Sequence, residues 1–533
     1  MREAKQVLKM GDEKYIMAID EGTTGIRAII FDHDGNIVSQ SYEKIKQIFP
    51  KAGWCEQDAT EIWGKCVSVM RGAIAGCGIG AEDIEAIGIT TQRSTNLLWN
   101  KKSGKPICNA ITWHDTRTAE LCRKMDGNGK IRAVRAIGNV ARKISGIWKG
   151  ILTTKTGALL ITASNLSFTP ASALAHTAWM LDNVEGARER AEKGEILFGT
   201  IDTWLIWNLT NGRVHATDFS NASSTGMFDP FALKWSKLFL STFNIPESIL
   251  PEVRDTSGDF GVADKKILGA EVPIRSAVAD QQSALFAEGC FNPGEVKCTN
   301  GTGSFIDMNV GSRPPASLHK LVPHIAWSID GKVTYMLEGM INTTGSAIQW
   351  LKDNLGIIDD VNLSEKMANS VESTEGVYFV PAFTGLSSPY WDPHACGIAV
   401  GLRRKTKKEH IVRAVLEGIV YRCRDILLSM EVDTQIKISS IKADGGASAN
   451  DFLLQFMADM LNVEVERPAI LDSTALGAAY LAGLASNYWQ SKEEILEKRK
   501  VDRIFEPQMD EKKRQALYNG WKKAIERSFG WHH

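Results

Sequence analysis

The chain has 533 residues, too many for one hydrophobic core, so we expect two domains of about 250 residues each. Its 62 lysines and arginines nearly balance its 63 aspartates and glutamates, which argues against general nucleic-acid binding. Residues 1–14 carry charges throughout, the nine cysteines are scattered singly, and no apolar run approaches the roughly 20 residues of a membrane span. These features predict a cytoplasmic protein with reduced thiols and no transmembrane span.

The first recognisable feature is a strand, a loop and a second strand between residues 14 and 32. An apolar run ends in Asp20, the turn Gly-Thr-Thr-Gly covers residues 22–25, and a second apolar run contains Arg27. Glycine lets a backbone approach a ligand closely, and turn N–H groups with threonine hydroxyls form a cradle for an anion. Asp20, at the mouth of the first strand, is placed to hold a hydrated Mg²⁺ beside phosphates. This stretch alone leaves an ordinary hairpin open as the alternative.

Two further apolar segments lead into polar or aromatic side chains. A predicted strand at residues 84–90 ends in Thr-Gln-Arg-Ser-Thr, and ligands of open α/β sheets bind at such strand ends. Arg93 offers a fork of donors for hydroxyls or phosphate, although a surface arginine paired with an acid fits equally well. Trp113 ends the second segment, residues 110–113, and either walls a small pocket or fills the core.

Residues 127–180 differ from the rest of the chain in charge. No Asp or Glu occurs between Asp126 and Asp182, while seven lysines and arginines fall between residues 130 and 155. A basic, partly apolar insert of this kind is a solvated helical subdomain, a lid, or a surface for an anionic partner or membrane. We favour the helical subdomain.

The second half of the chain repeats the opening pattern. Asp280 stands at a predicted strand-to-helix junction, where it either caps the helix or presents a carboxylate to a substrate. Residues 296–309 then read as strand, Gly-Thr-Gly loop and strand. This predicts two halves built alike that face each other across a cleft. The small-residue helix at 474–485 is predicted to serve close packing rather than function.

Six motifs in chain order resemble the FGGY carbohydrate kinases. They are Asp20-Glu-Gly-Thr-Thr, Thr91-Gln-Arg, Asp280-Gln-Gln, Asn300-Gly-Thr-Gly, Ala382-Phe-Thr-Gly-Leu and Asp444-Gly-Gly-Ala-Ser-Ala-Asn. The resemblance runs from about residue 14 to 530. It implies an α/β fold of two actin-like, ribonuclease-H-like ATPase domains facing each other across a nucleotide cleft. The domains would be residues 14–287, on the polyol side and including the insert, and 288–533, on the nucleotide side, after an N-terminal extension of residues 1–13.

The resemblance also implies ATP and Mg²⁺ as cofactors and assigns the site residues. ATP would contact Thr23, Thr24, Gly25, Arg27, Thr302, Gly345, Gln349, Gly446 and Asn450. The polyol would contact Arg93, Ser94, Trp113, Asp280, Gln281 and Phe305. Asp280 would be the base that accepts the hydroxyl proton, and Asp20 would hold the metal.

Among these kinases the chain looks closest to those that act on glycerol and to a divergent branch beside them, with two departures. Glycerol kinases carry Arg-Glu where this chain has Arg93-Ser94, and a pocket tyrosine has no match, the nearest register being residues 170–173. Loss of a bond to a charged group costs about 1.5 to 3 kcal/mol, or roughly 10- to 150-fold in binding. Either glycerol binds weakly or the substrate is another molecule. The resemblance as a whole implies ATP-dependent phosphorylation of a small polyol, most simply of glycerol to glycerol 3-phosphate. A kinase for another polyol or sugar, a nucleotide sensor without transfer, and an actin- or chaperone-like ATPase are the alternatives. By analogy with other members of the family, we expect a dimer or tetramer.

Overall fold

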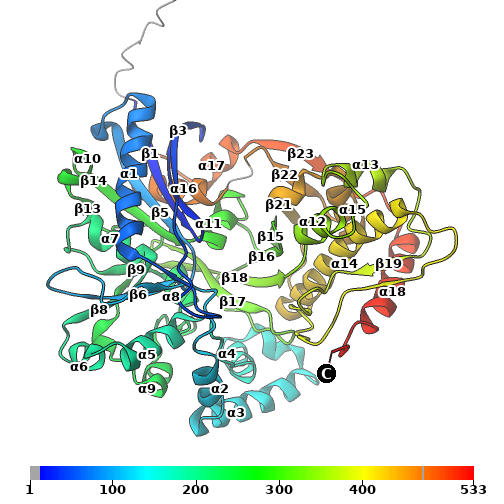
Figure 1. The fold of residues 1–533 in the computed structure, drawn as a ribbon, viewed down its shortest axis with the longest axis horizontal. Helices are drawn as coiled ribbons and strands as arrows, with labels where there is room; N and C mark the ends of the chain where they lie inside the picture. The colour runs from blue at the N-terminus through cyan, green and yellow to red at the C-terminus, as the bar shows by residue number, and fades with distance from the viewer. Residues whose placement is uncertain (1–12, 471–472, 533) are drawn as a thin grey trace, which may run out of the picture.

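The computed structural model describes residues 13–470 and 473–532, arranged as two α/β halves that lie side by side (Figure 1). Each half is built on one twisted sheet covered by helices. The predicted N-terminal extension, residues 1–13, lies outside the described residues except for Glu13. No helix among residues 13–470 and 473–532 has the length and apolar character that a bilayer crossing requires.

The first sheet places the opening hairpin at its centre. β1 pairs in parallel with β5 and antiparallel with β2, so the first glycine–threonine turn lies at the end where β5 also stops. The strand order is β13 (Val262–Ala263), β14 (Val272–Ala279), β5 (Ile84–Thr91), β1 (Tyr15–Gly22), β2 (Gly25–Phe31) and β3 (Ile37–Lys44).

The second sheet repeats this arrangement. β15 pairs in parallel with β21 and antiparallel with β16, as β1 does with β5 and β2. The prediction of two halves built alike is therefore confirmed. The strand order is β17 (Val322–Ile329), β18 (Lys332–Ile341), β16 (Ser304–Gly311), β15 (Glu295–Asn300), β21 (Ser440–Asp444), β22 (Val465–Pro468) and β23 (Val501–Phe505).

The small-residue helix α16 (Ser473–Ala485) packs against strands of the first sheet and against α11 (Asp280–Ala287), although it comes late in the chain. A Cβ on Gly477 would lie 1.9 Å from the carbonyl oxygen of Ser283, so this approach requires glycine. The prediction that this helix serves close packing is confirmed. α16 lies after the predicted domain boundary at residue 287, yet it packs against the first sheet. The boundary therefore divides the sequence more clearly than it divides the structure, and it stays a prediction.

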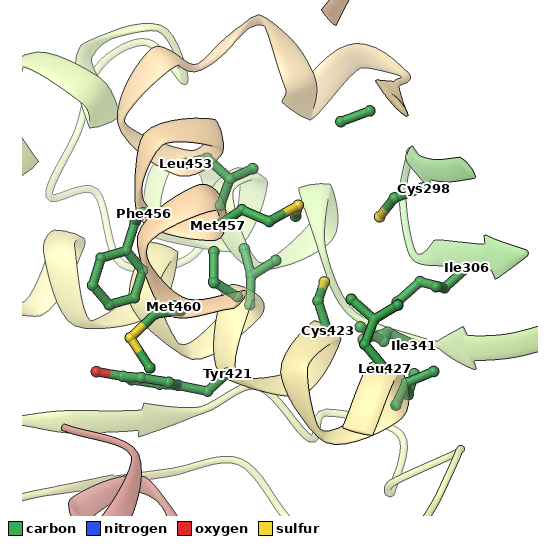
Figure 2. Packing of buried hydrophobic residues seen from close by; sticks show 14 of the residues in the cluster. Cys298, Ile306, Ile341, Tyr421, Cys423, Leu427, Leu453, Phe456, Met457 and Met460 are labelled. Atoms are coloured by element: carbon green, nitrogen blue, oxygen red, sulfur yellow. The ribbon is translucent and has the colours of Figure 1, made fainter. Parts of the chain in front are cut away.

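The core of the second half lies between its sheet and the long helix α14 (Lys408–Thr434). Figure 2 shows Cys423 and Leu427 of α14 on the side of Cys298, Ile306 and Ile341 of the strands, and Tyr421 of α14 beside Phe456 and Met460 of α15 (Asp451–Leu461). Leu453 and Met457 of α15 complete the cluster. This packing anchors the ends of β15 and β21, from which two of the glycine-rich loops emerge.

The basic insert folds into helices. α3 (Gly129–Ser145) and α4 (Lys155–Ser164) pack together, and Arg142 and Asn165 donate to the carbonyls of Leu318 and Ser317 at 2.5 and 2.6 Å. The outer face of α3 leaves Ile137 and other apolar side chains exposed. The favoured interpretation, a helical subdomain, is thus the one observed, and it is docked on the second half.

The remaining elements complete the layers around the sheets. A smaller sheet has the order β4 (Glu56–Gln57), β7 (Ala110–Ile111), β6 (Asn96–Asn100) and β8 (Ile196–Thr200). Further helices are α1 (Ala59–Cys77), α2 (Ala119–Asp126), α5 (Ala173–Asn183), α6 (Ala187–Glu192), α7 (Ile201–Leu209), α8 (Phe219–Ser224), α9 (Lys237–Phe243), α10 (Lys265–Leu268), α12 (Gly345–Asp353), α13 (Leu363–Asn369), α17 (Lys492–Lys498) and α18 (Glu511–Glu526). Short paired strands are β9 (Ala216–Asp218) with β12 (Glu252–Arg254), β10 (Phe228–Asp229) with β11 (Lys234–Trp235), and β19 (Tyr378–Val380) with β20 (Ile398–Val400).

Candidate active site

The first glycine–threonine loop is the turn between β1 and β2, at residues 22–25. Behind it, Asp20 and Arg27 face each other across the hairpin, and Arg27 Nε donates to Asp20 Oδ2 at 2.8 Å. Glu21 is fully buried, and burial raises its pKa well above the usual range, which favours the protonated form. Gln92 Nε2 donates to Glu21 Oε1 at 2.9 Å. At the base of the loop, the carboxylate of Asp20 is thus paired with the guanidinium of Arg27.

A metal ion at this place would depend on ligands from a substrate. Among the described residues, no group of three or more His, Cys, Asp or Glu side chains is placed to hold a metal. Mg²⁺ in proteins commonly binds one or two carboxylates together with water and phosphate oxygens. The carboxylate of Asp20 beside an anion cradle fits that donor set.

The second glycine–threonine loop, residues 301–303, joins β15 to β16 and is tied to the start of α12. The amide of Thr344 donates to the carbonyl of Thr302, and that of Gly345 to the carbonyl of Gly301, each at 2.9 Å. A Cβ on Gly345 would lie 2.6 Å from the oxygen of Gly301, so the contact requires glycine. The loop is thus hydrogen-bonded directly to the start of the helix.

A cavity of about 800 Å³ opens beside this unit, a size typical of small-molecule and cofactor sites. The structure brings five of the predicted nucleotide residues together on its walls: Thr302, Gly345, Gln349, Gly446 and Asn450. Much of the wall was missed from sequence, namely Ser346, Trp350, Asn354, Asn362, Ser364, Glu365 and Phe383. Trp350 and Ser346 adjoin predicted residues, whereas residues 361–365 lie in a stretch without a motif.

The predicted acceptor residues meet near the end of β5. Arg93 Nε lies 3.4 Å from Asp280 Oδ1, and its guanidinium lies 5.8 Å from the centre of the Phe305 ring. Asp280 is the first residue of α11 rather than its N-cap, and its side chain is 31% exposed. Trp113 Nε1 donates to the hydroxyl of Thr23 at 3.0 Å, so the acceptor residues adjoin the first phosphate loop. A carboxylate, a guanidinium and two aromatic rings thus lie beside a cradle for phosphate.

Two predicted acceptor residues are engaged by other protein groups. Ser94 has a left-handed backbone with φ 65°, and its hydroxyl donates to the carbonyl of Ser224 at 3.0 Å. Gln281 Oε1 accepts a hydrogen bond from Lys297 Nζ at 2.6 Å. Gln281 is therefore held in place by the second half of the chain.

A buried charge cluster beside Arg93 was missed from sequence. Arg93 Nη1 lies 2.7 Å from Glu338 Oε2, and Lys297 Nζ lies 2.7 Å from Asp307 Oδ2 with both side chains fully buried. Burial raises the pKa of Asp307 to about 6, and burial together with the charge of Arg93 lowers the pKa of His324 to about 3. The available signal was a charged residue inside an apolar strand, as in Val-Lys-Cys at 296–298.

Comparison with known proteins identifies the family. The N-terminal domain model of the FGGY family of carbohydrate kinases matches residues 15–147 and 151–287, and the C-terminal domain model matches residues 296–486. The chain belongs to the FGGY family of carbohydrate kinases. The N-terminal match covers the basic insert except for residues 148–150.

Individual FGGY kinases are similar over nearly the whole chain. Glycerol kinase of Thermoanaerobacter sp. is 52% identical over 518 residues, which cover 97% of this chain and 99% of that protein. The crystal structure of Plasmodium falciparum glycerol kinase with ADP superposes with a TM-score of 0.87 at 32% identity, covering 97% of this chain and 98% of that one. Gluconate kinase of Lactobacillus acidophilus, with a TM-score of 0.81 at 21% identity, covers 97% of this chain and 99% of its own and shares the fold.

Proposed function

We propose that this FGGY kinase transfers the terminal phosphoryl group of ATP to a hydroxyl of glycerol and releases glycerol 3-phosphate and ADP. The observation that carries the proposal is the 52% identity to a glycerol kinase over 97% of the chain. The site geometry supports it, because Asp280 and Arg93 lie together beside the first phosphate loop.

The acceptor side supplies the base and the hydroxyl-binding groups. Asp280 would hold the attacking hydroxyl and take its proton late, since an alcohol is too weak an acid to be ionised beforehand. Arg93 would donate to acceptor oxygens, while Trp113 and Phe305 would enclose the carbon chain. Ser94 and Gln281 border the same group of residues, at positions next to Arg93 and Asp280.

The nucleotide side supplies positioning and charge. Thr23, Thr24 and Gly25 would donate to the terminal phosphates, with Arg27 behind them, and the adenosine would fill the 800 Å³ cavity bordered by Gly446 and Asn450. Mg²⁺, bound through Asp20 and the phosphates, would supply positive charge to the migrating group. Closing of the two halves would exclude water, which otherwise competes as the acceptor.

The first test measures ATP consumption with Mg²⁺ and a panel of glycerol, longer polyols and ketoses, with the product identified by mass. Efficient turnover of glycerol supports the proposal and shows that other groups replace the glutamate and tyrosine absent from this chain. A clear preference for a longer polyol or a ketose would make it a kinase for that acceptor. Tight ATP binding without transfer to any member of the panel would contradict the proposal.

The second test addresses the base. Asp280→Asn should lower transfer by roughly 10²- to 10⁴-fold while ADP binding stays nearly unchanged. Asp58→Asn is the matched control, because Asp58 caps α1 by accepting from the amides of Thr60 and Glu61, and asparagine caps a helix equally well. Full activity in Asp280→Asn would contradict the assignment.

Our proposals for cellular location and for assembly rest on composition and on analogy with the family. We propose a cytoplasmic enzyme, in keeping with nine cysteines that all occur as free thiols in the described part of the chain. We further propose a homodimer or homotetramer, by analogy with FGGY kinases. Light scattering on the purified protein would decide the assembly, and a monomeric mass at working concentration would contradict it.

A further inference from the structure

The guanidinium of Arg93 lies between two carboxylates that come from the two halves of the chain. Its Nε is 3.4 Å from Asp280 Oδ1 at the start of α11, and its Nη1 is 2.7 Å from Glu338 Oε2 on β18. The side chain of Glu338 is 8% exposed, whereas that of Asp280 is 31% exposed. The buried carboxylate of Glu338 thus makes the shorter contact with Arg93, and the more accessible carboxylate of Asp280 makes the longer one.

The second sheet fixes Glu338 in this position. Glu338 pairs across β18 and β16 with Asp307, which pairs in turn with Lys297 on β15, so all three side chains lie on one face of the sheet. Lys297 Nζ lies 2.7 Å from Asp307 Oδ2 and donates to Gln281 Oε1 at 2.6 Å. Because Lys297 compensates the charge of Asp307, Arg93 is the cation that compensates the charge of Glu338.

His324 does not compensate the charge of Glu338 in place of Arg93. In the described part of the chain, the ion-pair partners of Glu338 are Arg93 and His324, whose Nε2 lies 3.8 Å from Glu338 Oε1. Burial and the charge of Arg93 lower the pKa of His324 to about 3, so its ring is neutral at pH 7. The guanidinium is therefore the cation shared between Glu338 and Asp280.

We propose that Glu338 is a positioning residue, which holds Arg93 so that the guanidinium does not form a short ion pair with Asp280 and this carboxylate can accept the proton of the acceptor hydroxyl. Apart from the longer contact with Arg93, Asp280 Oδ1 accepts from its neighbour's amide, that of Gln281, at 2.7 Å. A carboxylate bound by two short hydrogen bonds to a guanidinium is a weak base, because the cation stabilises its charge. With the short contact taken by Glu338, Asp280 keeps the longer one. In the transfer, the acceptor oxygen bonds to the terminal phosphorus, the bond to ADP breaks, and the proton passes to Asp280. This inference rests on the proposed function.

The test is Glu338→Gln, which removes the charge and keeps the size. Arg93 then has Asp280 as its remaining close carboxylate, and we expect kcat to fall about 10- to 100-fold with the KM for ATP within about twofold of wild type. The acidic limb of the pH profile of kcat should also move to lower pH, because a base paired with a cation is protonated only at lower pH. A purely structural role would not move that limb.

The pH profile needs its own control, because other groups face these carboxylates. They are Arg93, Lys297, Asp307, His324 and Glu21. Asp307 is the one whose pKa burial raises to about 6, so Asp307→Asn shows how much of the acidic limb belongs to that residue. A limb that still moves on Glu338→Gln in the Asp307→Asn background supports the proposal.

Glu417→Gln is the matched control for loss of a buried ion pair. Glu417 lies on α14 and is 5% exposed, and its Oε1 is 2.8 Å from Arg413 Nε. We expect it to leave kcat and the pH profile unchanged. Glu338→Asp, which keeps the charge on a shorter side chain, should give an intermediate loss, and it serves as the test should Glu338→Gln not fold.

The outcomes separate this inference from the proposed function. Active wild type, with kcat and the acidic limb changed in Glu338→Gln and unchanged in Glu417→Gln, supports the inference. Active wild type with Glu338→Gln and Glu338→Asp matching Glu417→Gln in both readouts overturns the inference alone. Wild type that transfers phosphate to no acceptor overturns the proposed function, and the inference with it.

Discussion

The indole nitrogen of Trp113 donates a hydrogen bond to the hydroxyl of Thr23 over a distance of 3.0 Å. Trp113 belongs to the predicted acceptor side and Thr23 to the first phosphate loop, so one bond joins the groups proposed to bind the two substrates. The tip of the loop is thereby held toward the acceptor residues. Transfer between two substrates depends on such alignment, because a small displacement of the reacting atoms lowers the rate steeply.

Trp113→Phe should therefore impair more than acceptor binding. The variant keeps an aromatic ring but loses the donor, and a net hydrogen bond is worth about 0.5 to 1.5 kcal/mol. We expect kcat/KM to fall roughly 2- to 13-fold for both glycerol and ATP. Thr23→Val removes the other partner, and steady-state kinetics of both single variants and the double variant should show non-additive losses. Fully additive losses would mean that the bond does not couple the two sides.

Two glycines of the nucleotide cavity should differ in how an added methyl group affects stability. At Gly345 the new Cβ would lie 2.6 Å from the oxygen of Gly301, whereas at Gly446 it would meet no heavy atom within 4 Å. Gly345→Ala should lower both the melting temperature and ADP affinity. Gly446→Ala should keep the melting temperature and weaken ADP binding, because its methyl group enters the cavity.

Thermal unfolding with and without ADP measures both effects, since a ligand that binds the folded state raises the melting temperature. Gly129→Ala is the control, because a Cβ there also meets no heavy atom within 4 Å and the residue lies on α3, outside the cavity. Unchanged ADP stabilisation in Gly446→Ala would mean that Gly446 does not border the nucleotide.

The glycine-rich loops were predictable from sequence because they are local. Residues 22–25 and 301–303 each lie between two apolar runs, and the glycines that a tight turn requires can be read directly from the sequence. The repetition of strand, loop and strand was enough to predict two halves built alike. Asp280 and Arg93 were singled out because each follows a predicted strand, the edge at which α/β sheets bind ligands.

The remainder of the site depends on contacts between distant segments. The contact of Glu338 with Arg93 joins β18 to the end of β5, and the cavity wall at residues 361–365 meets Gly446 only after folding. Strand register, rather than any local pattern, sets Lys297, Asp307 and Glu338 in a row. Motif and periodicity do not encode such pairings, which is why the charge cluster was missed.

The basic insert should loosen when the hydrogen bonds of Asn165 are removed. Asn165 Nδ2 donates to the carbonyl of Ser317 at 2.6 Å, and Asn165 Oδ1 accepts from Arg142 Nη1 at 2.7 Å. Asn165→Ala loses both bonds, which together contribute about 1 to 2 kcal/mol, and local opening should become about 5- to 30-fold more frequent. Limited trypsin digestion should cleave the insert faster by that factor, with little change in melting temperature. Asn139→Ala, on the exposed face of α3, should digest like wild type.

His176 should make stability depend on pH. It is fully buried, and burial lowers its pKa to about 4 from the ordinary 6.5. Because the unfolded chain takes up a proton below pH 6.5 and the folded protein does not, this residue costs stability as the pH falls from 6.5 to 4. At pH 5 the cost is about 2 kcal/mol.

Urea unfolding of His176→Phe and wild type at pH 7.5 and pH 5 tests this contribution. The difference in unfolding free energy should shift by about 2 kcal/mol in favour of the variant at pH 5, since phenylalanine cannot be protonated. The bond between His176 Nδ1 and Asn96 Oδ1, at 3.2 Å, is lost at both pH values and cancels from the comparison. An equal difference at both pH values would contradict the assignment.

Replacing the buried ion pair of Lys297 and Asp307 should affect the stability and the activity of the protein differently. Lys297→Met leaves Asp307 uncompensated and should cost about 3 to 5 kcal/mol in urea unfolding, whereas Lys297→Met with Asp307→Leu removes both charges and should recover most of it. The double variant should nevertheless remain slow, because Lys297 Nζ also holds Gln281 Oε1 at 2.6 Å, next to Asp280. Kinetics and unfolding of the same samples check both parts. Recovered activity in the double variant would show that Gln281 needs no anchor and that the pair is structural alone.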